Sequence, residues 1–229
     1  MILHVLERAL AARNVKRAIV ATDDERILDA VKSAGFEAMM TRTDHVSGSD
    51  RLAEVAERLE ETEVIVNLQG DEPLVSHRTI ERAVDELLMD ESAQIVTTSE
   101  EITDVADVLS VDVVKVVTDE RGRALYFSRS PIPFPRDAVR RYGTLVAALE
   151  IEPGLLARFR KHTGLYVYRR AFLLEYTRWP QSELERAESL EQLRALERGV
   201  MIKVVEAESV SIGVDTEQDL ERVRKMFAE

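Results

Sequence analysis

The chain has 229 residues, enough to bury a substantial core in one domain, or in one domain with a sub-lobe. Its formal net charge of −12 argues against nucleic-acid binding, which favours clustered lysine and arginine. It has no cysteine, which excludes disulfides and thiolate sites, and its 45% hydrophobic and 32% charged residues give no indication of a membrane span. Because no apolar signal-peptide core is present, the predicted location is cytoplasmic.

The first part of the chain alternates helix-like and strand-like segments. Apolar residues at helical spacing predict the first helix, and a second amphipathic segment stops at Gly35, a residue that favours helix ends. The predicted order is helix 2–10, strand 17–22, helix 25–34, strand 36–41, helix 49–61 and strand 64–68. This alternation predicts an α/β fold with a mostly parallel, Rossmann-like sheet and helices on both faces.

The rest of the chain continues with weaker regularity. The stretch 131–161 contains Pro131, Pro133, Pro135 and Pro153 with few regular signals, so we expect it to leave the sheet. We therefore predict a single domain over 1–229 with an irregular segment at about 131–161. The remaining predicted elements are helix 79–89, strands 94–99, 113–118, 124–128 and 164–169, helix 184–198, strand 201–207 and helix 216–227.

The segment VIVNLQGDEP, from Val64 to Pro73, is the first candidate site. Its nearly continuous apolar run suits a strand covered on both faces, and Asp71 follows the carboxyl end of that strand. Ligands bind at this edge of open α/β sheets, so Asp71 is a candidate metal ligand or catalytic group. The alternative is a simple turn, since Gly70, Asp71 and Pro73 are all turn-favouring residues.

A second carboxylate, Asp215 in the segment IGVDT, lies between a short apolar segment and the last predicted helix. Its alternative role is to cap that helix together with Gln218. If Asp71 and Asp215 lie at one sheet edge, the pair suits magnesium, which takes one or two carboxylates and fills its octahedron with water and phosphate oxygens.

Four further groups of residues are weaker candidates. Ser47 and Gly48 lie where a helix starts, beside the donors Arg42 and Arg51, and could meet a base or a phosphate; the alternative is a capping loop. Arg129 could bind a carboxylate or pair with a surface acid. His162 and Tyr166 are a third candidate, and the alternative is that their rings belong to the core. The segment ESLEQLR, with Glu191 and Gln192, is a fourth, and the alternative is a helix face exposed to solvent.

Several common catalytic patterns are missing from the sequence. It contains no GxSxG, HExxH, GxGxxG or GxxxxGK[ST], so hydrolase, zinc-protease, dinucleotide-binding and common NTPase functions have no support. Any chemistry is therefore expected to depend on a metal and on charge.

Taken in order, the motifs resemble one family. ATDDE, MTRTDHVSGSDRL, VIVNLQGDEP, ALYFSR, KHTGLYVYR, SLEQLR and GVDT are similar to those of the 3-deoxy-manno-octulosonate (Kdo) cytidylyltransferases, also called CMP-Kdo synthetases. The resemblance runs from Met1 to about Arg224. It implies the nucleotide-sugar transferase type of α/β fold, with a small dimerisation sub-lobe around 131–161 and a homodimer. It also implies transfer of CMP from CTP to Kdo for lipopolysaccharide biosynthesis, with no nucleic-acid partner and no membrane insertion.

The resemblance assigns roles to individual residues. It implies that Asp71 and Asp215 are the catalytic residues and hold Mg²⁺. It implies that CTP is bound by Arg42, Ser47, Gly48, Arg51 and Gln69. It implies that Kdo is bound by Arg129, His162, Tyr166, Glu191 and Gln192.

The resemblance is incomplete at one end. Members of the family begin with a strand and a basic loop before the segment that matches Met1 to Leu6, so the first strand of the sheet is expected to be missing here. Two alternatives therefore stay open: a truncated, non-catalytic nucleotide-binding remnant, and a cytidylyltransferase for another acidic sugar, such as an amino variant of Kdo.

Overall fold

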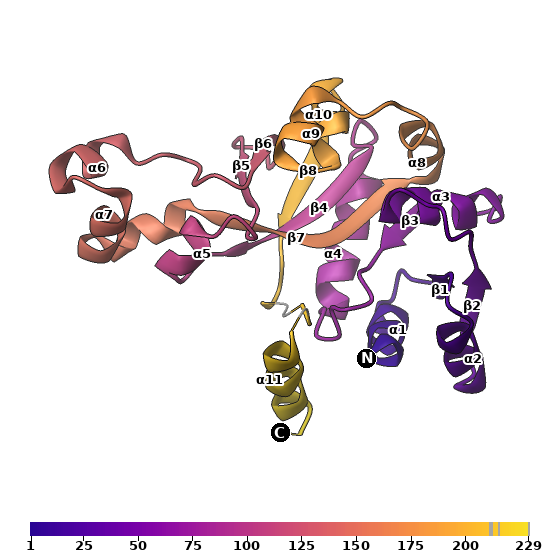
Figure 1. The fold of residues 1–229 in the computed structure, drawn as a ribbon. Coiled ribbons are helices and arrows are strands. Elements are labelled where there is room, and N and C mark those ends of the chain that lie inside the picture. Colours follow the sequence, from indigo (N-terminus) through magenta and orange to yellow (C-terminus); the bar gives the residue numbers. More distant parts are fainter. Residues whose placement is uncertain (211–212, 215, 229) are drawn as a thin grey trace. The chain divides into compact units, whose positions relative to one another are not determined.

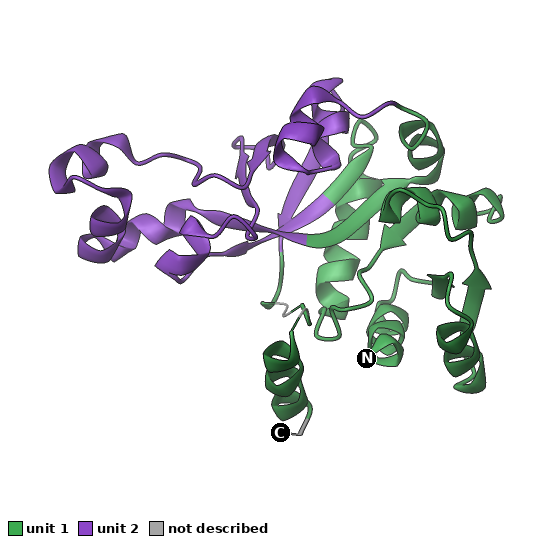
Figure 2. Cartoon of the chain, viewed as in Figure 1, with its two compact units in different colours: residues 1–96, 164–179, 207–229 green, residues 97–163, 180–206 purple. Residues whose placement is uncertain are grey.

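The structure is a computed structural model that describes residues 1–210, 213–214 and 216–228. Contacts within the chain define two compact units, coloured green and purple in Figure 2. Unit 1 consists of residues 1–96, 164–179 and 207–229, and unit 2 of residues 97–163 and 180–206. The segment at about 131–161 thus lies entirely in unit 2.

Unit 1 contains the alternating segments of the first part of the chain (Figure 1). Its elements are α1 (Ile2–Ala11), β1 (Ile19–Thr22), α2 (Glu25–Ser33), β2 (Glu37–Met40), α3 (Gly48–Glu57), β3 (Val64–Asn67), α4 (His77–Met89), α8 (Arg170–Tyr176) and α11 (Glu217–Ala228). Leu6 of α1, Val20 of β1 and Val31 of α2 are buried together, which accounts for the apolar spacing in the sequence. Gly35, with φ at +85°, follows α2 as the sequence predicts.

Unit 2 contains shorter helices and the remaining strands. Its elements are α5 (Val105–Leu109), β5 (Lys115–Thr118), β6 (Ala124–Ser128), α6 (Arg136–Tyr142), α7 (Leu145–Ile151), the 3₁₀ helix η1 (Pro153–Arg158), α9 (Glu183–Glu188), α10 (Gln192–Glu197) and β8 (Ile202–Glu206). Two further strands, β4 (Ile95–Glu101) and β7 (Arg160–Arg169), have residues in both units. Within the described part of the chain, no helix is long and apolar enough to cross a lipid bilayer.

The strand pairings confirm the α/β class and define a mixed sheet. β1 and β2 are parallel, as the alternation predicts. β3 pairs antiparallel with β7, so that Val64 lies opposite Arg169 and Asn67 opposite Tyr166. β5 pairs antiparallel with both β6 and β7, and the larger sheet has the order β6-β5-β7-β4-β8. The partner of β3 comes from about a hundred residues downstream, which no local sequence pattern indicates.

The stretch 131–161 is more regular than the sequence predicts. It forms α6, α7 and η1 before β7 begins. The prolines contribute to this order, because Pro135 is the N-cap of α6 and Pro153 opens η1. Buried Val108, Leu149 and Phe159 give these helices a small core of their own.

The predicted continuous helix over 184–198 is wrong. The chain forms α9 and α10 with a break at Ser189, whose φ of +54° lies in the left-handed region. A residue in the left-handed conformation cannot continue a right-handed helix, so a prediction from the amphipathic spacing alone makes this helix too long. The predicted helix over 49–61 is also too long, because α3 ends with Arg58 as its C-cap.

Two adjacent arginines connect β7 to helix ends of unit 1. The Arg169 guanidinium donates to the carbonyl oxygens of Leu87 and Ala93 at 2.8 and 2.9 Å, near the end of α4. Arg170 donates to the carbonyl oxygen of Ala56 at 2.8 Å, in the last turn of α3. Arg169 thus supplies donors to carbonyls in the last turn of α4 and just after it. Arg170 adds a second donor to the Ala56 carbonyl, which also accepts from the N–H of Leu59.

Aromatic rings pack around α8. Tyr168 lies parallel to Tyr176 with ring centroids 6.5 Å apart, and Phe172 lies parallel to Tyr176 at 5.7 Å. Trp179 meets Phe172 and Tyr176 edge-on at 5.7 and 5.9 Å. Parallel and edge-on geometries are the favoured ones for aromatic pairs, so this cluster is a stable part of unit 1.

Candidate active site

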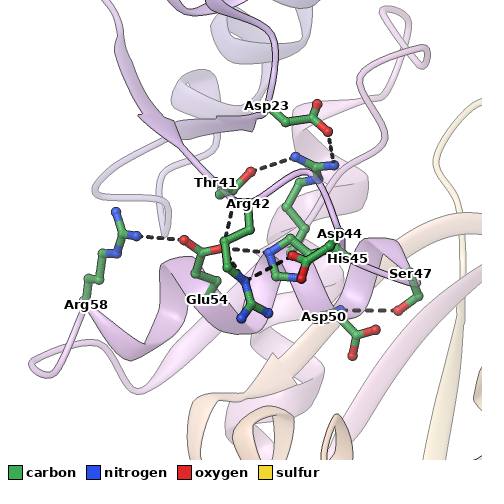
Figure 3. Close-up of polar contacts among 10 residues, drawn as sticks. Asp23, Thr41, Arg42, Asp44, His45, Ser47, Asp50, Glu54 and Arg58 are labelled. Atoms are coloured by element: carbon green, nitrogen blue, oxygen red, sulfur yellow. Dashed lines mark hydrogen bonds and ion pairs between the residues drawn. The ribbon is translucent and has the colours of Figure 1, made fainter.

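The segment between β2 and α3 positions the first group of predicted CTP residues (Figure 3). Ser47 is the N-cap of α3, because its Oγ accepts a hydrogen bond from the backbone N–H of Asp50 at 3.2 Å. Gly48 opens the helix, and a Cβ added there would meet no described atom within 4 Å. The first turn of a helix leaves backbone N–H groups without helical partners, so this position suits a phosphate.

Arg51 links three elements of unit 1. Its guanidinium donates to Thr41 Oγ1 at 2.6 Å and to Asp23 Oδ2 at 2.9 Å. This contact lowers the pKa of Asp23 below its ordinary value. Arg51 therefore connects the chain after β1 and the chain after β2 to α3, in addition to any contact with a ligand.

Arg42 has a fixed backbone and an exposed side chain. Its backbone N–H donates to Glu54 Oε2 at 3.1 Å, while the guanidinium is 68% exposed and 3.3 Å from Asp44. An exposed guanidinium can reach an anionic ligand at small cost.

The pair His45 and Glu54 is the feature of this region that sequence reasoning missed. The His45 side chain is 3% exposed and its Nε2 lies 2.6 Å from Glu54 Oε2 (Figure 3). Glu54 also accepts from Arg58 at 2.7 Å, and the N–H of Arg42 together with His45 lowers the pKa of Glu54. The i,i+4 spacing of Glu54 and Arg58 is visible in the sequence, but the His45 contact depends on how the loop folds back.

A concavity of about 430 Å³ lies beside this pair. It is bounded by the loop, by one face of α3 and by the chain after α8. Its lining residues are Arg42, Asp44, His45, Val46, Asp50, Ala53, Glu54, Glu57, Thr177 and Arg178.

The segment after β3 contains both a turn and the predicted acid. The backbone N–H of Glu72 donates to the carbonyl of Gln69 at 3.3 Å, so the turn alternative describes the backbone correctly. Gln69 is exposed and Asp71 is partly buried. β7 passes closely here, because a Cβ on Gly164 would lie 3.0 Å from Glu72 Oε1 and 3.1 Å from Gln69 Cγ. Glycine at 164 therefore leaves room for the two side chains.

The same turn is joined to the IGVDT segment. The backbone N–H of Val214 donates to the carbonyl of Asp71 at 2.9 Å. Asp215 follows Val214 in the sequence but lies outside the described residues. The cap that the structure describes at α11 is formed by Thr216 and Asp219, whose side chains each accept the other's backbone N–H at 3.2 and 3.1 Å.

The possible metal ligands at this turn fit magnesium better than a metal that requires several protein ligands. Among the residues that the structure describes, no group of three or more His, Asp or Glu side chains could enclose a metal ion. Nor does the Asp71 carboxylate have a hydrogen bond or an ion pair to any described residue. A carboxylate that is free to coordinate suits magnesium, which takes its other oxygens from water and phosphates.

The predicted Kdo residues of unit 2 have different environments. His162 Nε2 lies 3.0 Å from Thr97 Oγ1, and Phe127 meets the imidazole edge-on at 5.1 Å. Gln192 is 6% exposed, and its Nε2 has no hydrogen-bond partner among the described residues. A buried amide donor without a protein partner is costly, so Gln192 fits a ligand oxygen.

The other predicted Kdo residues are engaged by the protein. Arg129 donates to backbone carbonyls around residue 188, and Glu191 lies 3.6 Å from the Arg194 guanidinium. Tyr166 belongs to unit 1, where its ring stacks on Tyr168 at 5.7 Å. The predicted site residues thus fall into a CTP group in unit 1 and, except for Tyr166, a Kdo group in unit 2.

Burial lowers the pKa of His162 from 6.5 to about 3. Between these values the unfolded chain binds a proton that the folded chain does not, so the free energy of unfolding falls as the pH drops, by up to about 1.4 kcal/mol per pH unit. Urea unfolding at pH 6.5 and 5.5 should show a smaller fall in the free energy of unfolding for His162→Gln than for the native chain. The control is His4→Gln, because the side chain of His4 is 47% exposed. Equal falls in the free energy of unfolding for His162→Gln and for the native chain would contradict the prediction.

Comparisons with known proteins give a consistent result. Residues 1–206 match the protein family described as Cytidylyltransferase. The 3-deoxy-manno-octulosonate cytidylyltransferase of Trichlorobacter lovleyi is 51% identical over 225 residues, covering 98% of this chain and 87% of the relative. The enzyme of the same name from Solibacter usitatus is 49% identical, covering 99% of this chain and 84% of the relative.

A solved structure agrees with these relatives. It is a CMP:2-keto-3-deoxy-manno-octonic acid synthetase complexed with CTP, 42% identical to this chain with a TM-score of 0.87. The match covers 99% of this chain and 87% of that one. With this agreement in sequence and fold over nearly its whole length, the chain belongs to the cytidylyltransferase family, among the 3-deoxy-manno-octulosonate cytidylyltransferases.

Proposed function

We propose that this protein transfers CMP from CTP to Kdo and releases pyrophosphate. The observation that carries the proposal is the hydrogen bond from Val214 to Asp71, which joins the two acidic motifs of unit 1 beside the turn that holds Gln69. The relatives named as Kdo cytidylyltransferases and the solved synthetase with CTP support it. They do not favour a non-catalytic remnant or a different sugar.

The chemistry needs no protein nucleophile. The anomeric hydroxyl of Kdo forms a bond to the α-phosphorus of CTP, the bond from that phosphorus to the pyrophosphate oxygen breaks, and the hydroxyl proton is released. The protein's task is then to position two substrates and to neutralise phosphate charge. Magnesium held by Asp71 and Asp215 would neutralise charge on the triphosphate.

Residues of unit 1 would bind the nucleotide. The helix start at Ser47 and Gly48 presents backbone N–H groups, while Arg42 and Arg51 add positive charge and Gln69 an amide. In unit 2 the Gln192 amide would donate to a sugar oxygen. The neutral His162 ring can accept or donate a hydrogen bond, and Tyr166 and Glu191 complete the residues proposed to touch Kdo. Arg129 contributes to the group through its hydrogen bonds to the main chain before Glu191.

The direct test is pyrophosphate release by the purified chain from CTP, Kdo and MgCl₂, with the product mass measured in parallel. We expect turnover that requires all three components and yields CMP-Kdo. Replacing CTP by UTP, and Kdo by its amino analogue, should each reduce the rate. Absence of turnover, or faster turnover of the amino analogue, would reject the proposal.

We also propose that the protein is a cytoplasmic homodimer associated through the segment 131–161. Phe134 and Ile151 are 59% and 58% exposed on this segment, and such apolar side chains favour association. Sedimentation should give twice the chain mass, and Ile151→Glu should shift the protein toward monomer. Leu125→Glu, at an equally exposed position on β6, is the control; a monomeric native chain would contradict this proposal.

A further inference from the structure

The break between α9 and α10 contains a serine in an unfavourable conformation. Ser189 is the one non-glycine residue with positive φ in the described part of the chain, at +54°. A side chain in this region meets steric repulsion that glycine avoids, so surrounding contacts must maintain it. The two proposed Kdo residues Glu191 and Gln192 lie two and three positions later, at the start of α10, which follows α9 after this turn (Figure 1).

The carboxylate before the turn is anchored to β6. Glu188 Oε1 accepts a hydrogen bond from the Ser128 hydroxyl at 2.6 Å, and Glu188 Oε2 accepts one from the backbone N–H of Arg129 at 2.9 Å. Both oxygens are therefore engaged by consecutive residues at the end of one strand. This fixes the last residue of α9 in two directions.

The Arg129 side chain holds the turn from the other side. Its Nε donates to the carbonyl of Glu188 at 2.8 Å, its Nη2 to the carbonyl of Ser189 at 3.4 Å, and its Nη1 to the carbonyl of Val111 at 2.8 Å. One planar guanidinium thus contacts the two carbonyls of the turn and a third from the segment before β5. A lysine ammonium could not reproduce this fork.

The backbone of Arg129 is itself held by a buried lysine. Lys115 is 0% exposed, and its Nζ donates to the carbonyl of Arg129 at 2.6 Å. It also donates to the carbonyls of Ser110 and Val113 at 2.8 and 2.6 Å. The main chain of Arg129 is therefore tied by Lys115 to the segment before β5.

We propose that Arg129 and Glu188 are positioning residues that maintain the left-handed turn at Ser189 and thereby orient Glu191 and Gln192 toward the sugar substrate. This rests on the proposed function only for the identity of the sugar. Arg129 then affects Kdo binding through the main chain of the turn. A direct bond from Arg129 to Kdo is the competing explanation, and the two make different predictions.

The kinetic test uses the purified full chain. Arg129→Ala should raise KM for Kdo at least tenfold and leave KM for CTP within twofold, because the residues proposed to bind CTP lie in unit 1. Glu188→Gln keeps one side-chain acceptor and turns the other into an amide donor, and should raise KM for Kdo less than Arg129→Ala does. Arg158→Ala, an exposed arginine of η1, is the matched control and should change neither constant.

Rescue at Ser189 separates the two explanations. Glycine adopts the left-handed conformation without steric cost, so Ser189→Gly in the Arg129→Ala background should recover KM by a factor on the order of ten. Ser189→Ala removes the same hydroxyl but keeps the Cβ, and should recover nothing. If Arg129 acts by binding Kdo directly, neither change at Ser189 restores KM, and the proposal is overturned.

Hydrogen exchange without substrate tests the turn independently of activity. The amides of residues 188–192 should exchange at least tenfold faster in Arg129→Ala and in Glu188→Gln, and more slowly again after Ser189→Gly. Unchanged exchange in both single variants overturns the proposal. If the native chain is inactive with Kdo while exchange behaves as expected, the proposed function fails and the role of Arg129 and Glu188 in the turn stands.

Discussion

The Asp71→Asn variant is expected to lose magnesium-dependent turnover, with kcat reduced at least about a hundredfold at saturating CTP and Kdo. The change removes the negative charge that a hard cation requires and leaves the shape of the side chain almost unaltered. Because the Asp71 carboxylate makes no hydrogen bond or ion pair to the described residues, the variant should lose little stability. Steady-state rates across a MgCl₂ titration, together with the thermal midpoint, measure both effects.

The control for Asp71 is Asp29→Asn, which removes an exposed carboxylate from α2 in the same unit. It should leave both kcat and the magnesium dependence unchanged. Near-native rates in Asp71→Asn would remove Asp71 from the metal site. A large fall in the thermal midpoint would show that the Asp71 side chain stabilises the folded state.

The Arg194→Met variant is expected to destabilise the protein by about 3–5 kcal/mol. Arg194 donates to both oxygens of Glu185 at 2.7 and 2.5 Å, and the two side chains are 7% and 3% exposed. Glu185 also accepts the backbone N–H of Ser182 at the start of α9. Removing the guanidinium leaves a buried carboxylate without its cation, which is why the expected cost is large.

Urea unfolding with the double variant Glu185→Leu/Arg194→Met completes this test. Removing both charges should recover much of the lost free energy of unfolding, since two apolar side chains can replace a buried ion pair. Arg224→Met is the control: its partner Glu221 is 56% exposed and its loss should cost less than about 1 kcal/mol. A cost below that value for Arg194→Met as well would refute the prediction.

Local patterns in the sequence predicted the elements whose contacts lie nearby. The apolar spacing of α1 and the cap at Ser47 depend on residues a few positions apart, and the structure confirms them. The apolar run from Val64 forms the predicted strand β3, but Ile65 is the one buried residue of that strand, so the expected cover on both faces is wrong. The motifs also led to the correct family, because their order along the chain is more specific than any one of them.

Contacts between distant residues could not be predicted in this way. The break at Ser189 depends on Arg129, sixty residues earlier, and a helical periodicity cannot show it. The packing of His45 against Glu54 requires the loop to fold back over α3. The segment after β7 forms α8, where no helix is predicted, although Phe172 and Tyr176 are packed there in the aromatic cluster.

The aromatic cluster around α8 gives the protein an intrinsic optical reporter. Trp179 is the one tryptophan of the chain, so its emission arises from a single defined position. It directly follows Arg178, which lines the concavity beside the loop between β2 and α3, and it packs against Tyr176. Changes in that emission during a titration with CTP would report events in unit 1 on the native protein, without any added label.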